Sequence, residues 1–464
     1  MVAMSDDSRK PEDRDPQEML AEMLRQMGIT PGVDGQIDLG ALLGRLQQQM
    51  VAFGMGAHAS GGGVNWQQTR ALTRQVTASL GSDPTPSDAE RRQLTEVTRL
   101  AELWLDEACD FAQVPAAAQA WSRAEWVEHT MDAWQQVSGP VVASIATAMS
   151  TMLSGGAMGG AMGALPPELG ALSNMLAPMM KQAAGAMYSM QLAQAIGKLS
   201  TQVLTGSEIG FQLLDVPRVT ALPTNVAAFA EGLEVSADDV LLYLLLREAA
   251  RQRLFSQVTW LGPQMLALVE HYAREISIDA SALEDAIDVD EMSQLTPEKL
   301  AEISEQLQGK LFEPTQTAEQ VEILGRLETL VALVEGWVDE VVAQAAGRFM
   351  PAAGALSETL RRRRVTGGPA EEVLKSLLGL ELRPRRVRDA ANLWAALTVD
   401  RGVGGRDAVW HHPDLIPTAA DLDDPLGYVS GESTTQLDDL DAELARLLEQ
   451  ERPDDPSTGD APQG

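Results

Sequence analysis

The stretch from Leu241 to Glu275 constrains the fold of this chain more than any other part of the sequence. It holds an apolar run, YLLL at 243–246 and LF at 254–255, with a charged segment, REAAR, inserted at 247–251. Positions four apart share one face of an α-helix, so the two arginines of this segment are predicted to stack on one side with the glutamate beside them. The pattern predicts a buried helix that carries charge into the protein interior.

The charged segment has the spacing of a zinc-peptidase motif, H-E-x-x-H. In that motif two histidines bind the metal and the glutamate polarises a water molecule on it. Here Glu248 is present, and Arg247 and Arg251 occupy the two histidine positions. A guanidinium stays protonated at working pH and offers no lone pair to a metal. The segment therefore indicates an active-site helix whose metal ligands have been replaced.

Four segments resemble one known family. Residues 246–260 (LREAARQRLFSQVTW) are similar to the active-site helix of the zincin-like family of zinc-dependent metalloproteases and hydrolases, a bacterial group with coenzyme F420-associated relatives. Residues 64–66, 333–339 (LVEGWVD) and 377–426 resemble the same family, so the resemblance covers roughly Val64 to Leu426. It implies a zincin-like fold, zinc as the family's cofactor and hydrolytic chemistry. It also implies that Glu248 stands at the general-base position.

A second helix, predicted from Thr317 to Gly347, carries Glu335 and Asp339. Their spacing of four places both carboxylates on one face. By resemblance to gluzincin-type sites, Glu335 is the candidate third zinc ligand and Asp339 the acid that orients a ligand histidine. Together with Glu248 they leave only oxygen donors, which suit Mg²⁺ or Ca²⁺ better than zinc. The two arginine charges would repel any cation, so no bound metal is expected.

The two arginines are expected to take the place of the metal's charge. A planar guanidinium matches a carboxylate in bidentate geometry, and a buried charge of either sign needs a partner. We therefore predict that at least one of Arg247 and Arg251 forms an ion pair with Glu335 or Asp339. The alternative places both arginines on the outer surface and gives the buried face to residues 244–246.

Helical periodicity nearly everywhere predicts a mainly α fold, a zincin-like helical domain with a small strand element around Val216 to Val226, beside the motif helix. A disordered tail (1–16) and short helices with a Gly-rich linker (17–63) are expected before this domain, which spans 64–426. The domain divides into a helical half at about 64–215 and a motif-bearing half at about 216–426, and an acidic tail follows at 427–464.

The apolar segment from Val141 to Leu165 is long enough to cross a bilayer, which needs about 20 apolar residues. Gly, Ala, Ser and Thr dominate it, and Pro166-Pro167 closes it. We interpret it as part of a Met-rich buried helical pair with a glycine elbow, with a membrane-associated hairpin as the alternative.

The formal net charge of −32 limits the partners, and 14 acidic but only two basic residues lie from Asp414 onward. Such a surface repels nucleic acid, because phosphate contacts depend on Lys and Arg. The basic clusters at 361–364 and 383–388 are expected to pair with the chain's own acidic side chains. A single cysteine, Cys109, and the lack of an apolar leader in the first residues predict a cytoplasmic protein.

The sequence favours two functions. The first is a non-catalytic protein that binds an unidentified protein or peptide partner on a metallopeptidase fold. The second is an active zinc metallopeptidase or hydrolase with displaced ligands. Candidates for such ligands are His271, which shares a helix face with Glu275, and the adjacent pair His411 and His412.

Overall fold

The computed structural model describes residues 64–155, 185–276, 317–365, 373–375 and 386–431. These residues all belong to one compact unit that begins at Gly62. The predictions for the N-terminal tail and linker, the glycine elbow and the acidic tail from residue 432 lie outside the described residues.

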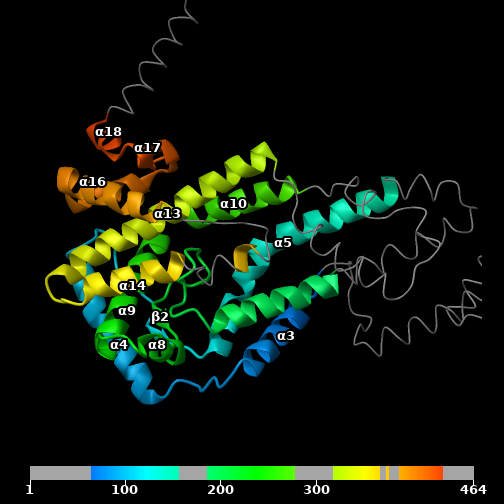
Figure 1. Ribbon diagram of the computed structural model, residues 1–464, viewed down its shortest axis with the longest axis horizontal. Helices are drawn as coiled ribbons and strands as arrows, with labels where there is room; N and C mark the ends of the chain where they lie inside the picture. The colour runs from blue at the N-terminus through cyan, green and yellow to red at the C-terminus, as the bar shows by residue number, and fades with distance from the viewer. Residues whose placement is uncertain (1–63, 156–184, 277–316, 366–372, 376–385, 432–464) are drawn as a thin grey trace, which may run out of the picture. The chain divides into compact units, whose positions relative to one another are not determined.

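The described residues are mainly helical, which confirms the predicted fold class (Figure 1). The strands are β1 (Gln119–Ala120) and β2 (Thr220–Ala221), and two 3₁₀ turns, η3 (Val409–His411) and η4 (Pro413–Leu415), follow the longest C-terminal helix. The helices include α3 (Trp66–Ser79), α4 (Asp88–Leu105), α5 (Arg123–Gly155), α8 (Pro223–Ala230), α9 (Ala237–Gln257), α10 (Leu261–Arg274), α13 (Ala318–Gly347), α14 (Ala353–Val365), α16 (Val387–Ala408), α17 (Ala419–Asp423) and α18 (Pro425–Ser430).

Helix α9 is the buried centre of this arrangement. It begins after Ser236, whose side chain accepts a hydrogen bond from the Asp239 backbone N–H, and two aspartates in its first turn suit the positive end of the helix dipole. Val240 and every residue from Leu242 to Phe255 are buried. Helices α4, α8, α13 and α14 pack around it, and Figure 1 shows α13 and α14 lying beside it. The charged motif is therefore enclosed by other helices.

Helix α13 begins at a capping box formed by Thr317 and Gln320, which agrees with the predicted start of this helix at Thr317. Its closest neighbour is α16, and the two helices approach at Gly336. A Cβ atom on Gly336 would lie 2.6 Å from Ala390 Cβ and 2.7 Å from the Ala391 backbone nitrogen. Trp394 of α16 donates its ring N–H to the Leu333 carbonyl at 2.9 Å, which holds the two helices in register.

The predicted strand element is present but shorter than expected. Strand β2 pairs in parallel with β1, with Thr220 opposite Gln119 and Ala221 opposite Ala120. Val226, which the prediction placed in the extended segment, lies instead in α8. The reason is Pro223, which stands in the first turn of α8, where its fixed φ angle and missing N–H favour a helix start.

Helix α5 continues through Pro140 to Gly155, so the described part of the apolar segment 141–165 is a continuation of this helix. Among the helices of the described residues, none combines the length and the apolar character that a membrane span requires.

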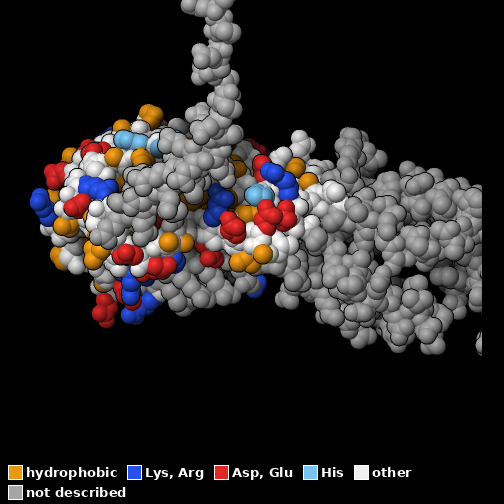
Figure 2. All heavy atoms as spheres, turned by 90° about the horizontal axis from the view of Figure 1, so that it is seen from above, with side chains coloured by type: hydrophobic (Ala, Val, Ile, Leu, Met, Phe, Trp, Pro, Cys, Tyr) orange, Lys and Arg blue, Asp and Glu red, His pale blue; other side chains and the backbone are white. Residues whose placement is uncertain are grey.

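The arginines of the first basic cluster, and Arg386 of the second, pair with acidic side chains of the same chain, as expected; residues 383–385 lie outside the described residues. In α14, Arg362 pairs with Glu358 at 2.9 Å and Arg363 pairs with Glu208. Arg386, in the second cluster, pairs with Asp423. Figure 2 shows acidic and basic side chains interspersed over one face of the described residues, with hydrophobic side chains between them.

Candidate functional site

The three charged residues of the α9 motif lie in the protein interior. Arg247 is 4% exposed, Arg251 is 1% exposed and Glu248 has no exposed surface. The two arginines stand one helical turn apart and face α13, as the four-residue spacing predicts. The alternative, with both arginines on the outer surface, is therefore wrong.

Glu335 and Asp339 face these arginines from α13. Arg247 Nη2 lies 2.9 Å from Glu335 Oε2, and its Nη1 is hydrogen-bonded to Asp339 Oδ1. Arg251 Nε donates to the other oxygen of Glu335, Oε1, at 2.8 Å. The predicted ion pair is thus confirmed, and both arginines take part in it.

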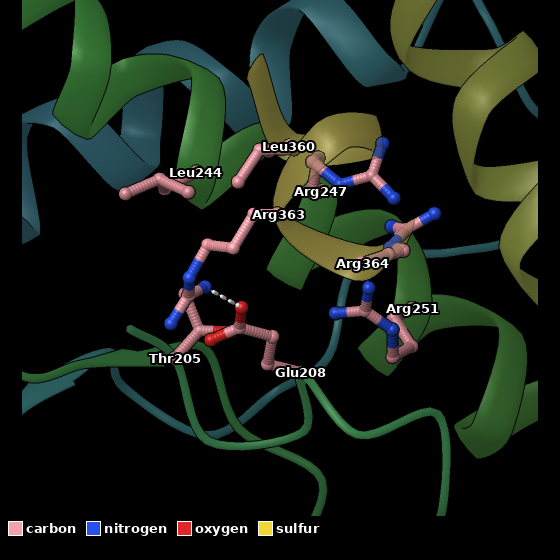
Figure 3. A pocket seen from close by; sticks show the side chains of 8 residues that line it. All are labelled: Thr205, Glu208, Leu244, Arg247, Arg251, Leu360, Arg363 and Arg364. Carbon is pink, nitrogen blue, oxygen red and sulfur yellow. Dashed lines mark hydrogen bonds and ion pairs between the residues drawn. The ribbon is translucent and has the colours of Figure 1, made fainter. Parts of the chain in front are cut away.

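Helix α14 adds two further arginines to the same carboxylates. Arg364 Nη2 donates to Glu335 Oε2 at 2.6 Å, and Arg361 Nε lies 3.4 Å from Asp339 Oδ2. Glu335 therefore accepts hydrogen bonds from three guanidinium groups. Figure 3 shows the guanidinium groups of Arg247, Arg251 and Arg364 gathered on one side of a pocket.

These two α14 residues were not linked to the site by the sequence. Arg361 and Arg364 belong to a run of four arginines, which indicated only a basic cluster. That run was the available signal, but nothing local says which acidic residues it reaches.

Glu248 has a different environment from the two α13 carboxylates. The Ser207 hydroxyl donates to its Oε2 at 2.8 Å, Gln252 Nε2 donates to its Oε1 at 3.0 Å, and Arg251 Nη1 lies 3.3 Å from Oε2. Ser207 comes from the loop before β2, and this loop approaches closely because Gly206 has no side chain. A Cβ atom there would lie 2.0 Å from Thr220 Oγ1 and 3.2 Å from Glu248 Oε1.

The pKa values of the carboxyl groups at the site are shifted in opposite directions. Burial alone would raise the pKa of Glu335, but Arg251, Arg364 and Arg247 outweigh it and hold that pKa below its ordinary value. Asp339 behaves in the same way beside Arg247. Burial raises the pKa of Glu248 above its ordinary value, because Arg251 and the hydrogen-bond donors around it compensate only part of its desolvation. Glu335 and Asp339 are therefore held as anions, whereas Glu248 is shifted toward its neutral form.

The histidines proposed as displaced ligands lie away from these residues. His271 Nε2 is 2.9 Å from Glu319 Oε1, at the start of α13. Glu319 precedes Glu335 by sixteen residues on one continuous helix, which corresponds to about 24 Å at 1.5 Å per residue. His412 accepts a hydrogen bond from the backbone N–H of Asp414, two residues away. No hydrogen bond or ion pair links these histidines, or His411, to the site among the described residues.

The comparison with known proteins identifies the family. The sequence profile of the zincin-like metallopeptidases matches residues 64–429, and this chain belongs to that family. A crystal structure from Chloroflexus aurantiacus, described as that of "a putative hydrolase with a novel fold", is similar with a TM-score of 0.54 and 16% sequence identity. The similarity covers 80% of this chain and 99% of that one, and at this identity it supports the fold alone. None of the curated proteins compared with the chain matches it.

Members of this family usually bind zinc, but the residues at this site do not fit the metal. A zincin site needs two imidazole nitrogens and a free carboxylate, whereas Arg247 and Arg251 have no lone pair to donate. Both oxygens of Glu335 already accept hydrogen bonds from guanidinium groups. Asp339 is likewise engaged by Arg247 and Arg361, so the oxygen-donor site for Mg²⁺ or Ca²⁺ considered from the sequence does not fit a cation either.

Proposed function

We propose that this protein is a non-catalytic member of the zincin-like metallopeptidase family that acts by binding a peptide or protein partner. The observation that carries the proposal is the engagement of Glu335 by Arg247 and Arg251, which stand at the two histidine positions of the motif. A site of this composition cannot hold zinc with an open position for water, which zincin hydrolysis requires.

The proposal is tested on purified, untagged protein. Total metal is measured by mass spectrometry, and cleavage of casein and of a peptide library is followed with and without a chelator. We expect far less than one zinc per chain and no chelator-sensitive cleavage. One zinc per chain together with chelator-sensitive cleavage would refute the proposal.

One observation favours the second candidate, an active zinc enzyme with displaced ligands. His271, Glu275 and Glu319 each offer a ligand atom, and the three atoms lie within 4.8 Å of one another. This cluster is partly exposed, and the position of Glu319 on α13 separates it from Glu335 by about 24 Å. A metal there could not use Glu248 as its base. Zinc bound by the wild type and lost from His271→Ala, together with loss of cleavage, would support this second function.

A further inference from the structure

A small pocket opens beside the buried ion pairs, between α9, α14 and the loop that precedes β2. It is small and partly open to solvent. Four arginines line it, Arg247, Arg251, Arg363 and Arg364, against one carboxylate, Glu208. Figure 3 shows Arg363 and Glu208 paired on the side opposite the other three arginines. The pocket therefore has a strongly cationic wall.

The carboxyl groups paired with these four arginines balance their charge only when all four carboxyl groups are ionised. The connected ion pairs join Arg247, Arg251 and Arg364 to Glu335, Asp339 and Glu248, Arg361 to Asp339, and Arg363 to Glu208. Arg361 is 37% exposed and does not line the pocket, so four lining arginines meet four carboxyl groups. Burial raises the pKa of one of these carboxyl groups, Glu248, and its neutral form leaves the arginines in excess. Net positive charge that is removed from water favours the entry of an anion.

Hydrogen-bond donors are also left over at the pocket. Arg251, only 1% exposed, uses Nε for Glu335 and Nη1 for Glu248, and its Nη2 has no hydrogen-bond partner among the described residues. Arg364 Nη1 lies 4.0 Å from Asp339 Oδ1, too far for a hydrogen bond. Arg251 is buried at the floor, whereas the side chains of Arg363 and Arg364 are 23% and 26% exposed. A ligand that enters beside α14 can therefore reach two donors, Arg251 Nη2 and Arg364 Nη1.

The rest of the lining is apolar. Leu244 of α9 and Leu360 of α14 border the pocket, and Figure 3 shows them together at one edge of it. An inorganic oxyanion would leave these side chains without a partner. A peptide that ends in an aliphatic residue offers both parts at once, a terminal carboxylate for the guanidinium groups and a side chain for the leucines.

We infer that this pocket binds the C-terminal carboxylate of a peptide whose last residue is aliphatic. The carboxylate bonds to Arg251 and Arg364, and the terminal side chain packs on Leu244 and Leu360. The inference rests on the proposed function and deepens it, because it names the chemistry that the non-catalytic site recognises.

The test uses the full-length protein and two peptides, N-acetyl-Ala-Ala-Leu with a free C-terminal carboxyl and the same peptide as its C-terminal amide. Binding is measured by isothermal titration calorimetry. We expect the amide to bind at least about tenfold more weakly, because it loses hydrogen bonds between charged groups. A peptide ending in glycine is expected to bind several-fold more weakly than the leucine peptide.

A matched pair of variants on α14 locates the binding. Arg364→Gln removes a pocket donor, whereas Arg362→Gln removes a neighbouring arginine whose side chain is 78% exposed and does not line the pocket. Arg364→Gln should weaken the binding of the free-acid peptide about as much as amidation of the peptide does. Arg362→Gln should leave the affinity for this peptide unchanged. Circular dichroism checks that each variant is folded. If Arg364→Gln does not fold, the comparison of the two peptides with wild-type protein still decides.

Three results would overturn the inference: equal affinity for acid and amide, no binding of either peptide by folded protein, or displacement of the peptide by inorganic phosphate but not by acetate. The last would indicate a phosphate site. Metal content and cleavage are measured independently of these titrations. A zinc-free, inactive protein that binds neither peptide would therefore refute the pocket's assignment and leave the proposed absence of catalysis standing.

Discussion

Arg247 and Arg251 place fixed positive charges where the family motif has neutral imidazoles. Removing a charged group from water costs several kcal/mol per ion, so buried guanidinium groups persist only where carboxylates meet them with good geometry. Glu335 meets this condition with both of its oxygens, and Arg364 adds a third guanidinium from α14. The stability of this region therefore depends on whether each charge keeps its partner.

The first prediction concerns Glu335, which is 4% exposed. Glu335→Ala should lower the free energy of unfolding by about 3–5 kcal/mol, because it leaves three arginines without their shared carboxylate. The double change with Arg251→Met should cost less than the sum of the single changes, because the two residues interact directly. Urea unfolding measures all three variants.

The control for this series is Glu358→Ala, which breaks the exposed pair with Arg362 and should change stability by no more than about 1 kcal/mol. Additive energies for Glu335 and Arg251 would contradict the ion pair.

The second prediction uses the opposite titration of two carboxyl groups whose ordinary pKa is 4.5. The pKa of Glu335 is lowered in the folded state, so the stability that it contributes is fully present above 4.5 and is lost as pH falls toward the folded value. The pKa of Glu248 is raised, so its contribution is present below 4.5 and is lost as pH rises through the folded value.

Unfolding measured across pH separates the two groups. The wild type should lose stability as pH falls, and Glu335→Gln should lose less of its own stability over the same range. Glu248→Gln should gain stability relative to the wild type as pH rises from acid to neutral. Parallel pH profiles for the wild type and Glu248→Gln would contradict the raised pKa of Glu248.

At the scale of elements, α13 holds the site together because it contacts α9 on one side and α16 on another. Its glycines differ sharply in their surroundings. Gly336 is buried against Ala390 of α16, whereas Gly325 is exposed and a Cβ atom there would meet nothing within 4 Å. Because Gly336 has no side chain, the backbones of α13 and α16 can approach each other closely at this point.

The third prediction compares these two glycines, which lie in the same helix. Gly325→Ala should stabilise the protein by about 0.5–1 kcal/mol, because alanine is the better helix former. Gly336→Ala should destabilise it by about 1–3 kcal/mol, because its Cβ would overlap the α16 backbone. Thermal and urea unfolding measure both effects. Equal effects of the two changes would show that the helices do not meet at Gly336.

At the scale of the whole molecule, the family match from residue 64 to residue 429 covers almost all the described elements. The fold brings the motif in α9, the carboxylates of α13 and the arginine run of α14 into one cluster. The carboxylates follow the motif by about 90 residues in the chain, and the arginine run follows it by about 115. Family membership thus rests on the sequence match over residues 64–429, while the chemistry of the site depends on two positions in α9.

The fourth prediction restores the family motif at those two positions. The double variant Arg247→His with Arg251→His should bind up to one zinc per chain, with Glu335 as the third ligand, because two imidazoles then share the helix face that faces α13. Metal is measured by mass spectrometry after dialysis, with the wild type as control. A folded double variant that takes up no zinc would show that the two positions do not correspond to the family's ligand positions.

The sequence by itself determined the local features of this protein. Ser236 and Thr317 predict the starts of α9 and α13, because capping involves residues only three apart, and the four-residue spacings predict which charged side chains share a face. The ion pair of Arg247 and Arg251 with Glu335 was predictable because the resemblance placed the two helices opposite each other. Tertiary structure alone decided that β1 pairs with β2, that Ser207 reaches Glu248, and that Arg364 reaches Glu335. These contacts join segments that no local pattern relates, because they form only when the packing of whole helices brings distant parts of the chain together.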